Sequence, residues 1–107
     1  MTDSTSKISD VRSLAASGNV KITQHAAQEM AEEDILLDDV MFAISKAQLL
    51  EDYPDHRRGA CSLIYGKDAR LRDIHIVCTT AHPTLIIVTV YLPRPPKWIA
   101  PTQRRSQ

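Results

Sequence analysis

Two neighbouring runs decide the fold: Ile74-His75-Ile76-Val77-Cys78-Thr79-Thr80 and Leu85-Ile86-Ile87-Val88-Thr89-Val90-Tyr91-Leu92. Both runs are rich in β-branched residues and have the two-residue period of strands, which predicts that each forms a β-strand. The break between them, Ala81 to Thr84, contains Pro83 and predicts the turn. We therefore expect an antiparallel hairpin over residues 74–92.

Side-chain alternation selects one register for this hairpin, because a slip of one residue would exchange the two faces. The favoured register contains four pairs, of which the first two are apolar: Ile76 with Val90, Cys78 with Val88, His75 with Tyr91, and Val77 with Thr89. The apolar face must meet the helices, so His, Tyr and Thr side chains gather on the other face.

The rest of the chain supplies three helical patterns and two further strand-like runs. Apolar residues recur every three or four positions in residues 6–17, 23–34 and 37–48, with Gly18 as an expected stop signal and Thr23 as an expected N-cap. Strands are expected at 49–53 and 61–65. The predicted fold is α+β, with two to three N-terminal helices packed on one face of a four-stranded, mainly antiparallel sheet.

Length and composition predict a single domain over residues 1–107. The chain has 107 residues, of which 43% are hydrophobic, and a chain of this size can bury one core. We expect a core at about 7–98 and a flexible basic tail at 99–107, anchored by Trp98. The start lacks a secretory pattern and Leu85–Val88 is too short to span a bilayer, so a cytoplasmic protein with no membrane association is expected.

The formal net charge is zero, but it is unevenly distributed along the chain. Residues 1–53 contain ten acidic and four basic residues, a net charge of −6, whereas residues 54–107 contain nine basic and three acidic residues, a net charge of +6. The zero sum therefore excludes only indiscriminate coating of polyanions. The candidate phosphate-binding groups are Arg57 and Arg58 in a loop and the basic residues after the last strand, namely Arg94, Lys97, Arg104 and Arg105, with a solvated basic surface as the alternative.

Candidate catalytic residues are His25, His75 and Tyr91. An unperturbed imidazole titrates near neutral pH, so His75 can serve as an acid or a base. Tyr91 across the strand pair can position it or bind phosphate, and Thr89 is a supporting donor. His25 lies in the first turn of a helix, whose dipole favours the neutral imidazole. The alternatives are a capping or core partner for His25 and a cross-strand packing pair for His75 with Tyr91.

The spacing of the His and Cys residues favours neither a metal site nor a disulfide. The His and Cys residues form neither a C-x-x-C nor an H-x-x-x-H pair, so no metal or other cofactor is expected. Cys61 and Cys78 are expected to be small buried residues on neighbouring strands.

The order and spacing of a scattered set of residues resemble the DUF4258 family over about residues 7–98. The residues that carry the resemblance are Thr23-Gln24-His25-Ala26, Met30, Ile35, Glu51-Asp52-Tyr53-Pro54, Gly66, His75, Thr89-Val90-Tyr91, Pro93 and Trp98. The family looks like part of the RelE-like (BECR) group of small toxins that are often paired with an antitoxin. The resemblance implies a metal-independent endoribonuclease fold, RNA as substrate and an antitoxin or other protein as partner.

Three positions depart from the family pattern. The family usually has Arg before the Met of the second helix and an Arg-Gly pair before the Ile, whereas this chain has Glu29, Glu33 and Asp34. Either the phosphate-binding cation comes from elsewhere or the activity has decayed. The leading hypothesis is therefore a RelE-like ribonuclease, the rival is a non-catalytic protein-interaction module of the same fold, and a third possibility is a phage- or plasmid-borne domain whose role the sequence does not reveal.

Overall fold

The computed structural model describes residues 4–56, 59–81 and 83–105. It contains three helices: α1 (Ser4–Ala16), α2 (Gln24–Glu32) and α3 (Leu37–Ser45). It also contains seven strands: β1 (Val20–Ile22), β2 (Gln48–Tyr53), β3 (Cys61–Lys67), β4 (Asp73–Thr79), β5 (Leu85–Tyr91), β6 (Trp98–Ala100) and β7 (Gln103–Arg104). None of the described helices is long and apolar enough to cross a bilayer.

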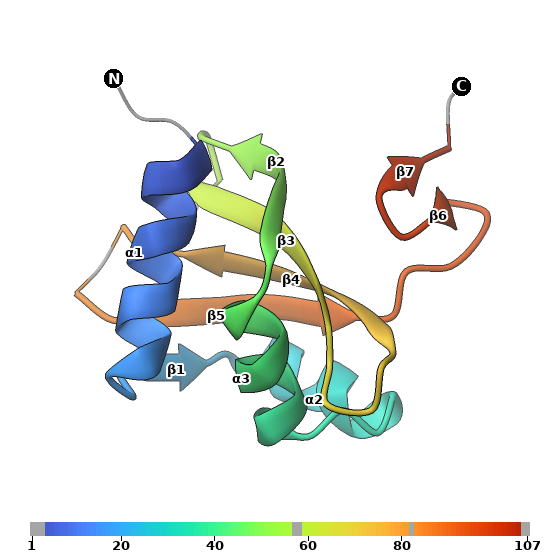
Figure 1. Cartoon of the computed structure of the whole chain (residues 1–107), viewed down its shortest axis with the longest axis horizontal. Coiled ribbons are helices and arrows are strands. Elements are labelled where there is room, and N and C mark those ends of the chain that lie inside the picture. Colours follow the sequence, from blue (N-terminus) through green and yellow to red (C-terminus); the bar gives the residue numbers. More distant parts are fainter. Residues whose placement is uncertain (1–3, 57–58, 82, 106–107) are drawn as a thin grey trace.

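Five strands form the main sheet, in the order β1-β5-β4-β3-β2, and β6 pairs with β7 in a separate small sheet (Figure 1). The mixed α+β class is confirmed, but the prediction of a four-stranded sheet is wrong. The additional strand is β1, which pairs in parallel with β5. Its three residues are too few to show a period, so their pairing depends on β5 and not on a local signal.

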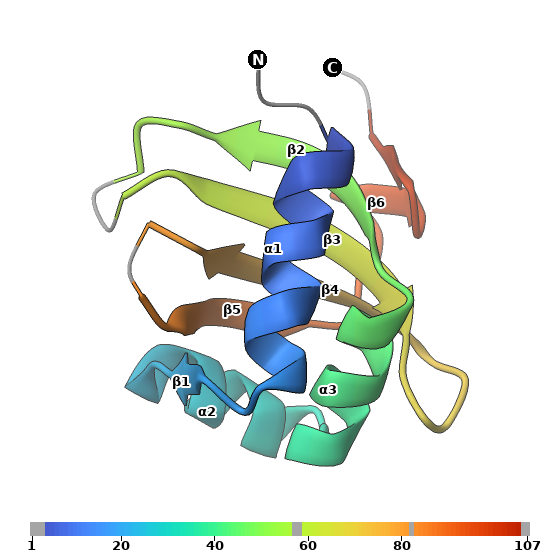
Figure 2. The ribbon, with the colours of Figure 1, turned by 60° about the vertical axis from the view of Figure 1, so that its left-hand side comes forward.

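The helices do not share one face of the sheet, which corrects the second part of the predicted architecture. Helices α1 and α3 cover one face, called the helical face below (Figure 2). Helix α2 lies along the edge of β5, just beyond the end of β1. Thr23 caps α2 as predicted, with its hydroxyl accepting a hydrogen bond from Ala26 N at 3.1 Å. Gly18 follows α1 with φ +76°, as expected for a residue that ends a helix.

The core lies between the sheet and the helices. Its buried members include Val11, Ala15, Val40, Ile44, Ile64, Ile76 and Val90. Helix α3 approaches β3 so closely at Gly66 that a Cβ on this residue would lie 2.5 Å from the carbonyl oxygen of Ala43. A residue without a side chain is therefore required where the helix crosses the strand.

The register of the β4–β5 hairpin agrees with the sequence prediction at three pairs and differs at the fourth. His75 pairs with Tyr91, Ile76 with Val90 and Val77 with Thr89, but Cys78 pairs with Ile87 because the register shifts after Val77. Val88 is the extra residue on β5. Its carbonyl oxygen accepts a hydrogen bond from the Thr23 hydroxyl at 3.0 Å, so the irregularity connects β5 to the start of α2.

The two cysteines are free and buried, as the sequence predicts. Their strands are neighbours, but Cys61 pairs with Thr79 and Cys78 with Ser62. Opposed residues share a face and successive residues alternate, so the two thiols lie on opposite faces of the sheet. Burial raises the pKa of Cys78 to about 12, which makes it an unreactive thiol.

A segment after β5, residues 93–105, folds back over the face of the sheet opposite the helices. This segment is called the C-terminal segment, and the face that it covers is called the polar face. In Figure 2, α1 lies in front of the sheet and β6 lies behind it. Trp98 is 3% exposed. Whereas the sequence predicted a flexible tail at residues 99–107, the structure has β6 and β7 paired there, with Trp98 opposite Arg104.

Candidate functional site

The polar face is centred on His75, which is fully buried. Its Nδ1 lies 3.1 Å from the Tyr91 hydroxyl, and its Nε2 lies 2.6 Å from the carbonyl oxygen of Pro101. The Trp98 ring packs edge-on against the imidazole, with 4.4 Å between ring centroids, and the ring of Tyr65, the partner of His75 on β3, lies 6.0 Å from it. The structure therefore brings together two of the three predicted catalytic residues, His75 and Tyr91.

These contacts fix the protonation of the pair. A carbonyl oxygen can only accept, so Nε2 carries the proton that it donates to Pro101, and Nδ1 of the neutral ring accepts from the Tyr91 hydroxyl. Burial lowers the pKa of His75, opposed by the Pro101 hydrogen bond and by the charge of Glu51. Burial also raises the pKa of Tyr91. At neutral pH the site thus holds a phenol that donates to a neutral imidazole.

A charged pair lies beside this dyad. Arg104 donates two hydrogen bonds to Glu51, from Nη2 to Oε1 at 2.7 Å and from Nε to Oε2 at 2.9 Å. The Tyr53 hydroxyl donates to the same Oε1 at 2.5 Å. The Arg104 guanidinium lies 4.7 Å from the centroid of the Trp98 ring, so the pair is joined to the ring that covers His75. Arg104 and Tyr53, and to a lesser extent Lys97, hold the pKa of Glu51 below its ordinary value.

Three polar attachments hold the C-terminal segment over the polar face. Arg94 forms a two-pronged pair with Glu33 at 2.6 and 3.1 Å. Pro101 accepts from His75, and Arg104 pairs with Glu51. The segment is thus fixed near its beginning, in its middle and near its end.

His25, the third predicted catalytic residue, lies apart from this group. Its side chain is 65% exposed at the start of α2, and its Nε2 lies 3.4 Å from Glu29 Oε1. Within the described part of the chain, the hydrogen-bond and ring partners of His75 are Tyr65, Tyr91, Trp98 and Pro101, and His25 is not among them. His25 is thus neither the cap of α2, which is Thr23, nor a core residue, and its catalytic role stays a prediction.

The predicted phosphate-binding residues are scattered. Thr89 is partly exposed on β5 opposite Val77. Lys97 is exposed and close enough to Glu51 to lower its pKa. Arg94 is exposed but paired with Glu33, so its charge is neutralised. Arg57 and Arg58 lie outside the described residues.

Three members of the site were not predicted as functional groups, namely Glu51, Trp98 and Pro101, whereas Arg104 belongs to the basic tail that was expected to bind phosphate. Glu51 lies in the strand expected at residues 49–53, and Trp98 is expected only as an anchor of the tail. The alternation of β2 offered a signal for Glu51, since a charged residue two positions before Tyr53 must share its face. Nothing local indicates that Pro101 and Arg104 return to β4 and β2, because their partners lie 26 and 53 residues away.

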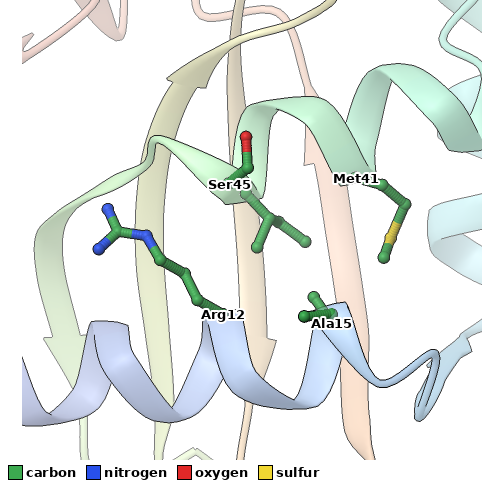
Figure 3. Close-up of a pocket in the computed structure, with 6 residues that line it drawn as sticks. Arg12, Ala15, Met41 and Ser45 are labelled. Carbon is green, nitrogen blue, oxygen red and sulfur yellow. The ribbon is translucent and has the colours of Figure 1, made fainter.

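The described chain also has a largely apolar pocket of about 310 Å³ between α1 and α3, on the helical face. Its lining consists of Arg12, Ala15, Ala16, Met41, Ile44 and Ser45 (Figure 3). Arg12 donates to the carbonyl oxygen of Ala47 at 2.5 Å. The pocket contains none of the predicted site residues. Among the described residues, no group of three His, Cys, Asp or Glu side chains is placed to hold a metal ion.

These features define a small α+β domain with a mixed five-stranded sheet and a covered His–Tyr pair on the face away from its main helices. The chain belongs to the family described as Domain of unknown function (DUF4258), whose model matches residues 22–92. No curated protein and no solved structure matches the chain. His25, His75 and Tyr91 lie inside the matched range, and the C-terminal segment lies beyond it.

The acidic residues Glu29, Glu33 and Asp34 have structural roles in this chain. Glu29 accepts from the backbone N–H of Val90 at 2.9 Å, and Glu33 accepts from that of Leu92. Both groups lie on the edge of β5 that β1 is too short to cover, so the carboxylates complete its hydrogen bonding. Asp34 has φ 54° and its side chain accepts from Arg70 at 3.1 Å. An Asp tolerates this left-handed conformation better than most residues.

Proposed function

We propose that the chain is a toxin-like, metal-independent endoribonuclease of the RelE-like (BECR) kind. The observation that supports this proposal most strongly is the hydrogen-bonded pair of His75 and Tyr91 beside Arg104 and Lys97 on the polar face. RNA cleavage without a metal needs a proton acceptor for the 2′-hydroxyl and cations for the charged phosphorane. This face offers both.

In the proposed reaction, Tyr91 is the group that meets RNA and His75 is the base behind it. The Tyr91 oxygen takes the proton of the 2′-hydroxyl while its own proton passes to His75 Nδ1, 3.1 Å away. The 2′-oxygen bonds to phosphorus, the bond to the 5′-oxygen breaks, and that oxygen takes a proton from water. The products are a 2′,3′-cyclic phosphate and a 5′-hydroxyl. Pro101 stabilises the imidazolium through Nε2, and His75 then returns its proton to solvent by way of Tyr91.

The covered state of the site sets a condition on this activity. Tyr91 is partly exposed, but His75 is fully buried beneath the C-terminal segment. RNA must therefore reach Tyr91 at the margin of the segment, or shift the segment and its polar attachments. An antitoxin that held the segment closed would keep the enzyme inactive.

A second candidate function is a non-catalytic protein-interaction module. It is favoured by the fact that both nitrogens of His75 are occupied while Glu33 and Glu51 neutralise Arg94 and Arg104. In this case the polar face is a second, smaller core, and the acidic helices recognise a partner.

The two functions separate in an RNA cleavage assay with product mapping. Purified protein is incubated with a mixed-sequence RNA without added metal, and the ends are identified by mass. We expect Tyr91→Phe to reduce the single-turnover rate at least about 100-fold, since it removes a general acid–base group. Tyr65→Phe is the matched control, because its hydroxyl also donates one hydrogen bond on this face, to Asp73 at 2.5 Å. This control is expected to keep most of the activity.

Equal loss in both tyrosine variants would contradict the assigned role of Tyr91. Absence of cleavage in the folded wild-type protein, together with a stoichiometric protein partner after purification, would favour the interaction module.

A further inference from the structure

The carboxylate of Glu51 is bound in the manner of an anionic ligand. It receives two parallel hydrogen bonds from Arg104 and one from Tyr53, and the positive charge of Lys97 lies nearby. A guanidinium presents the same two-pronged geometry to a carboxylate and to a phosphate. The donors around Glu51 therefore suit a phosphate oxygen pair equally well.

These groups are accessible from solvent, unlike His75. The side chains of Glu51 and Arg104 are 28% and 39% exposed, and Lys97 is exposed on the same segment. An ion pair with this exposure is weak enough to be exchanged for a polyanion, because water and salt screen it. A ligand phosphate can thus replace the carboxylate without unfolding the sheet.

The position of the pair connects it to the proposed catalytic dyad. Arg104 lies over the Trp98 ring, and Trp98 packs on His75. The indole N–H of Trp98 is buried and points to the Tyr91 oxygen closely enough to lower the pKa of that phenol, so the ring beneath Arg104 also contacts the proposed catalytic tyrosine.

We propose that Arg104, Lys97 and the Tyr53 hydroxyl form a binding site for an RNA phosphate, which Glu51 occupies as an internal substitute when RNA is absent. The identity of the ligand as RNA rests on the proposed function. Binding of RNA displaces Glu51 from Arg104, and this displacement releases the last of the three attachments of the C-terminal segment. Glu51 is therefore an inhibitory residue, and its neutral form should bind RNA more tightly.

The test measures the binding of a 2′-O-methyl RNA oligonucleotide, which cannot be cleaved because it lacks a free 2′-hydroxyl. We expect Glu51→Gln to lower the dissociation constant by about tenfold, since it frees the two cations. Glu33→Gln is the matched control, because it makes the same charge change and also frees a paired arginine, Arg94. The control is expected to stay within about twofold of wild type. Equal tightening in both variants, or none in Glu51→Gln, would overturn the inference.

A second pair of variants keeps the inference testable if Glu51→Gln does not fold. Arg104→Ala should weaken RNA binding and reduce the slope of log Kd against log salt by about one, because one phosphate contact is lost. Its exposed neighbour Arg105 provides the control, and Arg105→Ala should change the slope less. Equal slopes in the two alanine variants would contradict a specific site at Arg104.

The outcomes for the site and for the nuclease are separable. Selective tightening in Glu51→Gln with no cleavage by wild type would leave the phosphate site standing and remove the catalytic proposal. RNA cleavage by the wild type without selectively tighter RNA binding by Glu51→Gln would remove the phosphate site and leave the catalytic proposal standing.

Discussion

The two faces of the central sheet are covered in different ways. The helical face is closed by α1 and α3, and its buried side chains, such as Ile64, Ile76 and Val90, are aliphatic. The polar face is closed by the C-terminal segment, and its centre is His75, with Tyr91 and Trp98 around it. Adjacent residues of one strand, His75 and Ile76, thus lie in two different environments.

This difference indicates which face can exchange its internal contacts for contacts with a ligand. Aliphatic packing depends on volume and shape, so it resists any alteration and offers no chemistry. The polar face depends on a few hydrogen bonds and on arginine–glutamate pairs, each of which can be exchanged for a ligand contact. We therefore expect changes on the helical face to act on folding and changes on the polar face to act on binding.

The largest effect is expected for Gly66→Ala on the helical face. The new methyl group would lie 2.5 Å from the carbonyl oxygen of Ala43, a backbone atom that cannot turn aside. We expect the free energy of unfolding to fall by about 3 kcal/mol, measured by urea denaturation. Gly18→Ala is the control, because it has open space around it and only its φ of +76° opposes a side chain. A loss no greater than that of Gly18→Ala would contradict the packing described for α3.

A smaller effect is expected for Trp98→Ala on the polar face. Truncation of a buried Trp usually costs about 3–5 kcal/mol, but here we expect only about 1–2 kcal/mol, because the C-terminal segment detaches while the main core stays closed. Amide hydrogen exchange should rise in residues 98–105 and stay slow in β4 and β5. Uniformly faster exchange throughout the sheet would show that the segment belongs to the main core.

The smallest effect is expected on acidification. Burial lowers the pKa of His75, so the unfolded chain binds more protons below its ordinary pKa of about 6.5. The contribution of neutral His75 to the free energy of unfolding is fully present above about pH 6.5. It is lost as the pH falls from about 6.5 towards the lowered pKa of the folded protein, by at most about 1.4 kcal/mol per pH unit. Urea denaturation at pH 7.5, 6.5 and 5.5 should show this loss in wild type and less of it in His75→Gln. Glu51 and Glu33 have lowered pKa values, so their protonation reduces the free energy of unfolding only at lower pH, below about 4.5.

The sequence contained enough information for the parts of the fold with a strong local period. The pairing of His75 with Tyr91 follows from alternation, and the cap at Thr23 follows from residue type. The parallel pairing of β1 with β5 could not be predicted from the sequence, because the three residues of β1 are too few to show a period. The shift at Val88 also has no local signal, since its partner is the Thr23 hydroxyl on another element.

The candidate site was predictable only where it lies on the hairpin. His75 and Tyr91 are opposed on neighbouring strands, so a register argument finds them. Pro101 and Arg104 reach the same face because the C-terminal segment folds back over the sheet. Their partners are distant in the sequence, so no local residue spacing predicts these contacts. The structural role of Glu29 was not predictable, because its carboxylate completes the hydrogen bonding of β5, which is distant in the sequence.

The central claim is that the polar face, and not the helical face, is the binding surface for RNA. The most direct measurement is an NMR titration of ¹⁵N-labelled protein with the 2′-O-methyl RNA oligonucleotide. The account predicts saturable shifts at the amides of Tyr91 and Trp98 and at the side-chain Nε of Arg104. Shifts confined to α1 and α3, around the pocket between them, or no saturable shifts at all, would contradict it.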